Sequence, residues 1–180
     1  MAVWRADYKL GGKAVTLRNA EPDDAPELIA LVNAFDEESA FLSREPGEFD
    51  MTEEKERAFL LECKESPDAL YLVAEAGGRI VGTASARRMD RRRYRHVAGI
   101  GLAVARAHWG MGIGKALLTE LLGFARENGV EKVELQVDTT NRRAIALYMS
   151  LGFTVEGTRR GDRKMADGTY RDGYWMGVFL

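Results

Sequence analysis

Three alternating glycines in one short stretch could hold a phosphate group. Gly110, Gly112 and Gly114 lie between an apolar run that predicts a strand and a second apolar run that predicts a helix. Glycine lacks a Cβ, so a ligand can approach its backbone closely, and it tolerates dihedral angles that other residues avoid. A helix that begins here directs unpaired N–H groups and the positive end of its dipole at one place. The stretch therefore predicts a site for a pyrophosphate-bearing cofactor at residues 110–115.

The spacing of these glycines excludes two common phosphate loops. A Walker loop places a glycine five residues before Gly-Lys and a Ser or Thr after it, but here Trp109 and Ala116 occupy those positions. A dinucleotide-binding loop needs its third glycine where this chain has Lys115. Gly-x-Gly-x-Gly alone is also typical of ordinary strand-to-helix turns.

A second stretch, Asn141 to Phe153, could place two polar side chains beside a ligand. Asn141 and Tyr148 are seven residues apart, so both lie on one face of a predicted helix, two turns apart. The alternative is that Tyr148 is a core aromatic residue packed with Ala144 and Leu151.

Together the two stretches resemble the signatures of the GNAT N-acetyltransferase superfamily. Its acetyl-CoA loop reads Arg/Gln-x-x-Gly-x-Gly/Ala, and residues 109–114 read Trp-Gly-Met-Gly-Ile-Gly. Its second signature, an Asn followed by Ala, Leu-Tyr and Gly-Phe, corresponds to residues 141–153. Trp109 departs from the pattern, which we interpret as variation within the family that leaves the backbone donors unaffected. The resemblance covers residues 14–180, and the final segment is similar to acetyltransferases of small amines, amino acids or ribosomal proteins.

The resemblance implies an enzyme that uses acetyl-CoA as co-substrate. It would transfer the acetyl group to a primary amine by direct attack in a ternary complex, with no metal. Tyr148 would be the general acid, because a phenol with a pKa of about 10 is protonated at neutral pH and can donate to the departing thiolate. The cofactor-binding residues that the resemblance implies are Leu102, Ala103, Val104, Trp109, Gly110, Met111, Gly112, Ile113, Gly114, Lys115, Asn141 and Tyr148.

No general base is predicted. Some protein-acetylating members carry Glu twelve residues before the tyrosine, but this chain has Gln136, and an amide cannot act as a base. His96, Glu37 and Glu38 are alternatives, each more typical of a structural role. The alternative to an enzyme is therefore a catalytically silent CoA-binding module with a regulatory or interaction role.

Two clusters of charged residues indicate what the protein could bind. Acidic residues crowd a segment that borders the acceptor site in the family: Asp36, Glu37, Glu38, Glu45, Glu48 and Asp50. An acidic rim favours a cationic amine, with Glu37 and Glu38 as substrate-binding candidates, although a solvated loop explains the same residues. The resemblance predicts a small-molecule or peptide amine as acceptor.

The basic cluster consists of Arg87, Arg88, Arg91, Arg92, Arg93 and Arg95. It could bind RNA, but the only aromatic residue within it is Tyr94, and the formal charge of −2 argues against broad binding of nucleic acid. A solvated hairpin is the favoured interpretation.

Length and composition predict one domain of ordinary globular character. The chain has 180 residues, of which 46% are hydrophobic and 30% charged. We expect an extension at residues 1–13 and a single domain at 14–180. Cys63 is the only cysteine, which excludes an internal disulfide, and it is expected to be a small buried hydrophobe. The absence of a membrane-length apolar run and of a secretory pattern predicts a cytoplasmic protein that does not bind membranes.

The expected fold class is α+β, with a mixed, mostly antiparallel central sheet flanked by helices. Strands are predicted at residues 14–18, 70–75, 79–85, 96–104, 130–137, 153–160 and 170–179. Helices are predicted to begin near residues 21, 52, 113 and 141, with Thr52 as the cap of the second one. Gly77 and Gly78 predict a hairpin turn between the strands at 70–75 and 79–85. The apolar strand at 96–104 is expected to be buried on both faces. By the resemblance, the last strands would contribute to a homodimer.

Overall fold

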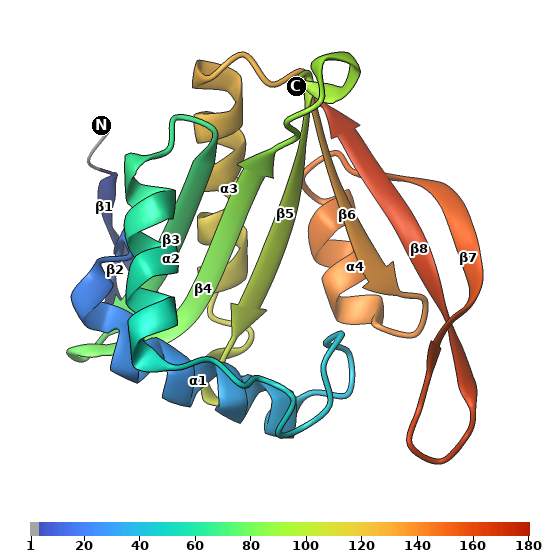
Figure 1. The fold of residues 1–180 in the computed structure, drawn as a ribbon, viewed down its shortest axis with the longest axis horizontal. Coiled ribbons are helices and arrows are strands. Elements are labelled where there is room, and N and C mark those ends of the chain that lie inside the picture. The colour runs from blue at the N-terminus through green and yellow to red at the C-terminus, as the bar shows by residue number, and fades with distance from the viewer. Residues whose placement is uncertain (1–3) are drawn as a thin grey trace.

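A single eight-stranded sheet forms the centre of the computed structural model, which describes residues 4–180 (Figure 1). The strand order is β1-β2-β3-β4-β5-β6-β8-β7. All neighbouring strands run antiparallel except β5 and β6, which run parallel. The predicted α+β class with a mixed, mostly antiparallel sheet is confirmed.

Helices cover both faces of this sheet. In Figure 1, α1 and α2 lie on the near face and α3 and α4 on the far face. The strands are β1 (Arg5–Leu10), β2 (Lys13–Asn19), β3 (Ala69–Ala76), β4 (Arg79–Arg88), β5 (Val97–Val104), β6 (Lys132–Asp138), β7 (Thr154–Lys164) and β8 (Tyr170–Phe179). The helices are α1 (Ala25–Glu38), α2 (Glu53–Glu65), α3 (Ile113–Glu127) and α4 (Arg142–Met149). None of the helices within residues 4–180 is long and apolar enough to cross a bilayer.

The core consists of two layers, one on each face of the sheet. Successive side chains of a strand point to opposite faces. Leu72 of β3 accordingly packs in the layer under α3, whereas Val73 packs in the layer under α1 and α2. The α3 layer is the larger, and Leu118 and Leu121 are fully buried in it.

β5 and β6 pair over only a short distance and then separate. Their shared ladder runs from Val97 to Gly99 on β5. Beyond that point β5 stays paired with β4 as far as Val104, and β6 stays paired with β8 as far as Asp138 (Figure 1). The sheet therefore opens between its two halves.

This separation makes one prediction wrong. The apolar character of residues 96–104 predicts burial on both faces, but only Val97 and Ala98 are buried and residues 99–104 are partly or fully exposed. These apolar side chains line an opening in the sheet. An apolar run of residues suits a cavity wall as well as it suits a strand that is buried on both faces.

The N-terminal segment also differs from its prediction. Residues 1–13 are predicted as an extension, but residues 5–10 form β1 and pair with β2 along their whole length. Trp4 and Tyr8 pack onto the domain, where both donate hydrogen bonds to Glu120 of α3. The sheet therefore begins at Arg5, and residues 1–3 lie outside the described part of the chain.

Several local predictions are confirmed. Thr52 caps α2 by accepting a hydrogen bond from the Lys55 N–H at 3.3 Å. Gly77 and Gly78 form the two-residue turn between β3 and β4, with φ values of 60° and 75°. Cys63 is buried in α2.

A buried carboxylate holds together the region beyond the opening. Asp138, at the end of β6, pairs with Arg163 of β7 at 2.5 Å and with Arg171 of β8 at 3.4 Å. Arg163 also donates to the carbonyl of Phe41, in the loop after α1, at 2.9 Å. Burial by itself raises the pKa of the Asp138 carboxyl, but hydrogen bonds from Thr140 and the neighbouring arginines outweigh it and hold this pKa below its usual value.

Replacing this carboxylate should destabilise the fold in a pH-dependent way. Asp138→Asn should lower the free energy of unfolding by about 1–3 kcal/mol at neutral pH, because two arginines lose their charged partner. A carboxyl with a depressed folded-state pKa stabilises the protein above its unfolded-state pKa, here 3.8, and this contribution is lost as the pH falls through the folded-state value. Urea unfolding at a series of pH values should show that the difference in free energy of unfolding between the wild type and Asp138→Asn disappears as the pH falls below the folded-state pKa of Asp138.

The control is Asp23→Asn, which removes an ion pair from a side chain that is 95% exposed. It should change the free energy of unfolding by less than about 0.5 kcal/mol. Equal stability of Asp138→Asn and the wild type at neutral pH would contradict the role given to Asp138.

Candidate functional site

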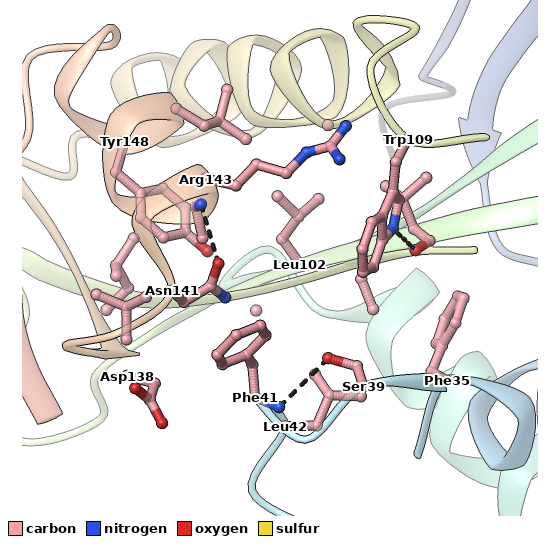
Figure 2. Close-up of a pocket in the computed structure, with 18 of the residues that line it drawn as sticks. Phe35, Ser39, Phe41, Leu42, Leu102, Trp109, Asp138, Asn141, Arg143 and Tyr148 are labelled. Atoms are coloured by element: carbon pink, nitrogen blue, oxygen red, sulfur yellow. Dashed lines mark hydrogen bonds between the residues drawn. The ribbon is translucent and has the colours of Figure 1, made fainter. Parts of the chain in front are cut away.

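A cavity of about 900 Å³ occupies the opening between β5 and β6 (Figure 2). Its walls come from the end of α1 and the loop after it, from β5 and β6, from the start of α3, and from α4 and β7. These segments are far apart in the sequence, and the separation of the two strands brings them to one place.

The glycine loop contributes one wall with unpaired backbone donors. Gly110 and Gly112 have φ values of 80° and 89°, in the left-handed region that favours glycine. Gly112 is the N-cap residue of α3, and no side chain caps the helix start. The first N–H groups of α3 and the positive end of its dipole are thus available to an anion.

Gly114 serves a different purpose from the other two glycines. It is a helical residue of α3, and a Cβ at this position would lie 3.3 Å from Cδ2 of Leu147 and 3.5 Å from Cδ2 of Leu102. Its absent side chain therefore lets α3 pack closely against α4 and β5. Met111, between the glycines, does not line the cavity, and its side chain packs on Gly11 of the β1–β2 turn.

β5 offers an open strand edge to the same cavity. Leu102, Ala103 and Val104 line it, and no strand of the described residues lies beside them on the β6 side. Backbone groups along a strand edge without a partner can pair with an extended ligand. Trp109 closes this end of β5, since its indole N–H donates to the Val104 carbonyl at 2.6 Å.

Asn141 and Tyr148 both line the cavity, from α4 (Figure 2). Asn141 is the N-cap of α4, and its side-chain oxygen accepts the Ala144 N–H at 3.1 Å. The Tyr148 side chain is 8% exposed and packs on Phe153, with the ring centroids 5.8 Å apart. Burial raises the pKa of Tyr148 to about 12. Its hydroxyl therefore stays protonated at neutral pH, as a proton donor must.

The structure separates the three candidates for a general base. Glu38 lines the cavity, where its carboxylate accepts the backbone N–H of Arg106 at 2.8 Å. Glu37 is exposed and outside the cavity wall. His96 is exposed at the opposite end of β5. Gln136, which stands where some relatives carry Glu, lines the cavity from β6.

The acidic segment formed by the last turn of α1 and the loop after it does not form a common rim. Of its six acids only Glu38 lines the cavity. Asp36 is buried and paired with Arg44 at 2.8 Å. The wall at this end is instead aromatic and apolar, formed by Phe35, Phe41 and Leu42.

The basic cluster is partly structural and lies outside this cavity wall. Arg87 pairs with Glu62, and Arg95 pairs with Asp68. Arg88 donates to the carbonyls of Asn128 and Gly129. These contacts tie the β4–β5 connection to α2 and to the end of α3.

The cavity residues that escaped sequence reasoning include Phe41, Asp138, Arg143 and Arg163. Arg143 lies inside the second signature, four residues before Leu147, and helical spacing alone places these two on one face. No sequence pattern distinguishes Arg163 from the other charged residues of the final hairpin.

Comparison with known proteins identifies the family. The model of the acetyltransferase (GNAT) family matches residues 31–153. The curated N-alpha-acetyltransferase RimI of Mycobacterium tuberculosis is 44% identical over 95 residues, which are 53% of this chain and 58% of that protein. The chain thus spans little more than half the length of this relative.

Two solved structures extend the likeness over nearly the whole chain. An acetyltransferase of the GNAT family from Streptococcus pneumoniae matches with a TM-score of 0.89 at 30% identity, covering 92% of this chain and 99% of that one. A phosphinothricin acetyltransferase from Sinorhizobium meliloti, solved in complex with AcCoA, matches with a TM-score of 0.79 at 25% identity, covering 92% and 88%. This chain therefore belongs to the acetyltransferase (GNAT) family.

Proposed function

We propose that this chain is an acetyl-CoA-dependent N-acetyltransferase that moves an acetyl group to a primary amine by direct attack in a ternary complex. The observation that carries the proposal is one cavity lined by the glycine loop, by the open edge of β5 and by Tyr148. The relatives support it, since RimI is named an N-alpha-acetyltransferase and the S. meliloti enzyme was solved with AcCoA.

The residues of the cavity fit a long, phosphate-bearing thioester. The backbone of residues 110–115 would bind the pyrophosphate, and a Cβ at Gly110 or Gly112 would be strained by the positive φ of that loop. The open edge of β5 at Leu102–Val104 and the amide of Asn141 would hold the pantetheine arm. A β5 N–H group would polarise the acetyl carbonyl as its oxygen becomes negative.

Tyr148 would supply the proton that the reaction needs at sulfur. The amine nitrogen forms a bond to the carbonyl carbon, the carbon–sulfur bond breaks, and the sulfur leaves with the electron pair. The Tyr148 hydroxyl would protonate that thiolate, while the amine nitrogen gives up its extra proton to water. Burial keeps this hydroxyl protonated.

The acceptor class follows from the relatives and from the open end of the cavity. RimI acts at α-amino groups according to its name, and the name of the S. meliloti enzyme gives a small molecule as its substrate. We propose a peptide or small-molecule amine that enters past Phe35, Phe41 and Leu42. A homodimer to which the last strands contribute, a cytoplasmic location, and the absence of nucleic-acid or membrane partners stay predictions.

A catalytically silent CoA-binding module is the weaker alternative. Gln136 favours it, because an amide cannot act as a base. The protonated Tyr148 in the same cavity and the acetyltransferase names of the relatives favour the enzyme.

The direct test is a mass-spectrometric screen with acetyl-CoA and pooled polyamines, amino acids and peptides with free N-termini. An amine that becomes heavier by one acetyl group would support the enzyme and identify the acceptor. Binding of acetyl-CoA without any product would favour the silent module. Failure to bind acetyl-CoA would overturn both.

Tyr148→Phe should lower turnover by about 100-fold or more, because a positioned general acid contributes about that much. Binding of CoA, measured by calorimetry, should be unchanged. Since the pKa of Tyr148 is about 12, wild-type turnover should not fall from deprotonation of this group across the neutral and mildly alkaline range. The control is Tyr94→Phe, at a side chain that is 57% exposed and outside the cavity. Unchanged turnover in Tyr148→Phe would remove this residue from the mechanism.

Gly112→Glu should abolish CoA binding, because a carboxylate at the start of α3 would occupy and repel the phosphate position. The matched control is Gly129→Glu, which introduces the same residue at another glycine of positive φ, 68°, with open space around it and outside the cavity wall. Calorimetric titration of CoA into the two variants separates loss of the site from backbone strain. Similar weakening in both would argue against the loop as the phosphate site.

A further inference from the structure

An indole ring beside the glycine loop holds two arginines. Trp109 is anchored by its hydrogen bond to the Val104 carbonyl. The guanidinium carbon of Arg106 lies 5.5 Å from the centre of its ring system, and that of Arg143 lies 5.0 Å away. Arg143 reaches this position from α4, and Figure 2 shows it extending along the cavity wall toward Trp109.

In the part of the chain that the structure describes, the guanidinium groups of these two arginines differ from many others in having no carboxylate partner. Arg44 and Arg95, for example, are paired with aspartates at 2.8 Å. Within residues 4–180, neither the Arg106 nor the Arg143 guanidinium has a carboxylate oxygen within 4.0 Å, and Glu38 contacts Arg106 only through its backbone N–H. Their charges therefore add to the positive end of the α3 dipole instead of being neutralised.

Two positive charges that share one ring repel each other, and a bound anion would offset this repulsion. The Trp109 ring attracts the Arg143 cation without accepting a conventional hydrogen bond from it, which leaves the guanidinium N–H groups free to donate. One of them is aimed at the loop, since Nη2 of Arg143 lies 3.4 Å from the place of a Cβ on Gly110. Arg143 and Trp109 both line the cavity.

A second polar group in this corner is also without a partner. His108, next to Trp109, lines the cavity, and its Nδ1 atom is buried without a hydrogen bond to any residue in the described part of the chain. Buried polar atoms of native proteins are nearly always hydrogen-bonded, so an orphaned one indicates a missing partner such as a ligand or water.

We propose that Arg143, positioned by Trp109, binds a phosphate group of the CoA co-substrate. The inference rests on the proposed function and assigns a residue to it outside the loop. It also gives Trp109 a role: where the family loop carries Arg or Gln, this chain carries a ring that holds a cation supplied by α4. Arg143 donates from its guanidinium edge to phosphate oxygens, beside the N–H groups of the loop.

The test is calorimetric binding of CoA and of 3′-dephospho-CoA to wild type, Arg143→Ala and Arg142→Ala. Arg142 is the matched control, because it is the adjacent exposed arginine of α4 and does not line the cavity. Arg143→Ala should weaken CoA binding by about tenfold or more, as expected for a lost charge-assisted hydrogen bond, and Arg142→Ala should not. The loss should shrink as salt is added.

The two ligands identify which phosphate is bound. An equal loss with both ligands assigns Arg143 to the pyrophosphate, and a loss confined to CoA assigns it to the 3′-phosphate. Unchanged binding in Arg143→Ala, with normal binding by the wild type, would overturn this inference and leave the proposed function standing. No CoA binding by the wild type would overturn both.

A double-mutant cycle tests whether Trp109 positions Arg143. Trp109→Leu should weaken CoA binding in the wild type but cause little further loss in Arg143→Ala, because its effect passes through the arginine. A merely structural role would give the same loss in both backgrounds and would refute the link between the two residues.

Discussion

Within residues 4–180, no strand lies beside the inner edge of β5 beyond Gly99, because β5 stays paired with β4 and β6 stays paired with β8. An unpaired strand edge costs free energy when it is buried, because its polar groups lack hydrogen bonds, and it promotes pairing with other chains when it is exposed. Here the open edge faces a cavity whose other walls depend on the same separation. α4 lies behind the gap and turns Asn141 and Tyr148 into it, and the loop after α1 closes its far end. A ligand with amides along its length would complete the hydrogen bonding that the sheet leaves unfinished.

The charges around this cavity are of two kinds. At the end of the cavity lined by Phe41, Asp138 pairs with Arg163 and Arg171, and Arg163 holds the loop that carries Phe41. Those arginines stabilise the wall. At the opposite end, Arg143 is held by an aromatic ring, which orients a guanidinium without cancelling its charge. The choice between a carboxylate and an indole as partner thus separates arginines that support the fold from one that remains available to an anion.

The glycine loop uses glycine for two different structural reasons. Positive φ at Gly110 and Gly112 shapes the turn and exposes N–H groups, whereas Gly114 is an ordinary helical residue that allows close packing against Leu147 and Leu102. The three glycines look equivalent in the sequence. Only the environment of each Cβ position distinguishes a residue that shapes the loop from one that brings α3 near α4.

The sequence by itself determined the family, the fold class, the Gly77-Gly78 turn and the cap at Thr52, because these depend on residues close together in the chain. It did not predict β1, whose short pattern is stabilised by contacts with α3 more than a hundred residues away. Tertiary structure alone decided that the apolar residues of β5 face a cavity, that Asp138 ties three segments together, and that Arg143 meets Trp109. Each of these depends on where β5 and β6 separate, and strand pairing between distant segments leaves no local mark in the sequence.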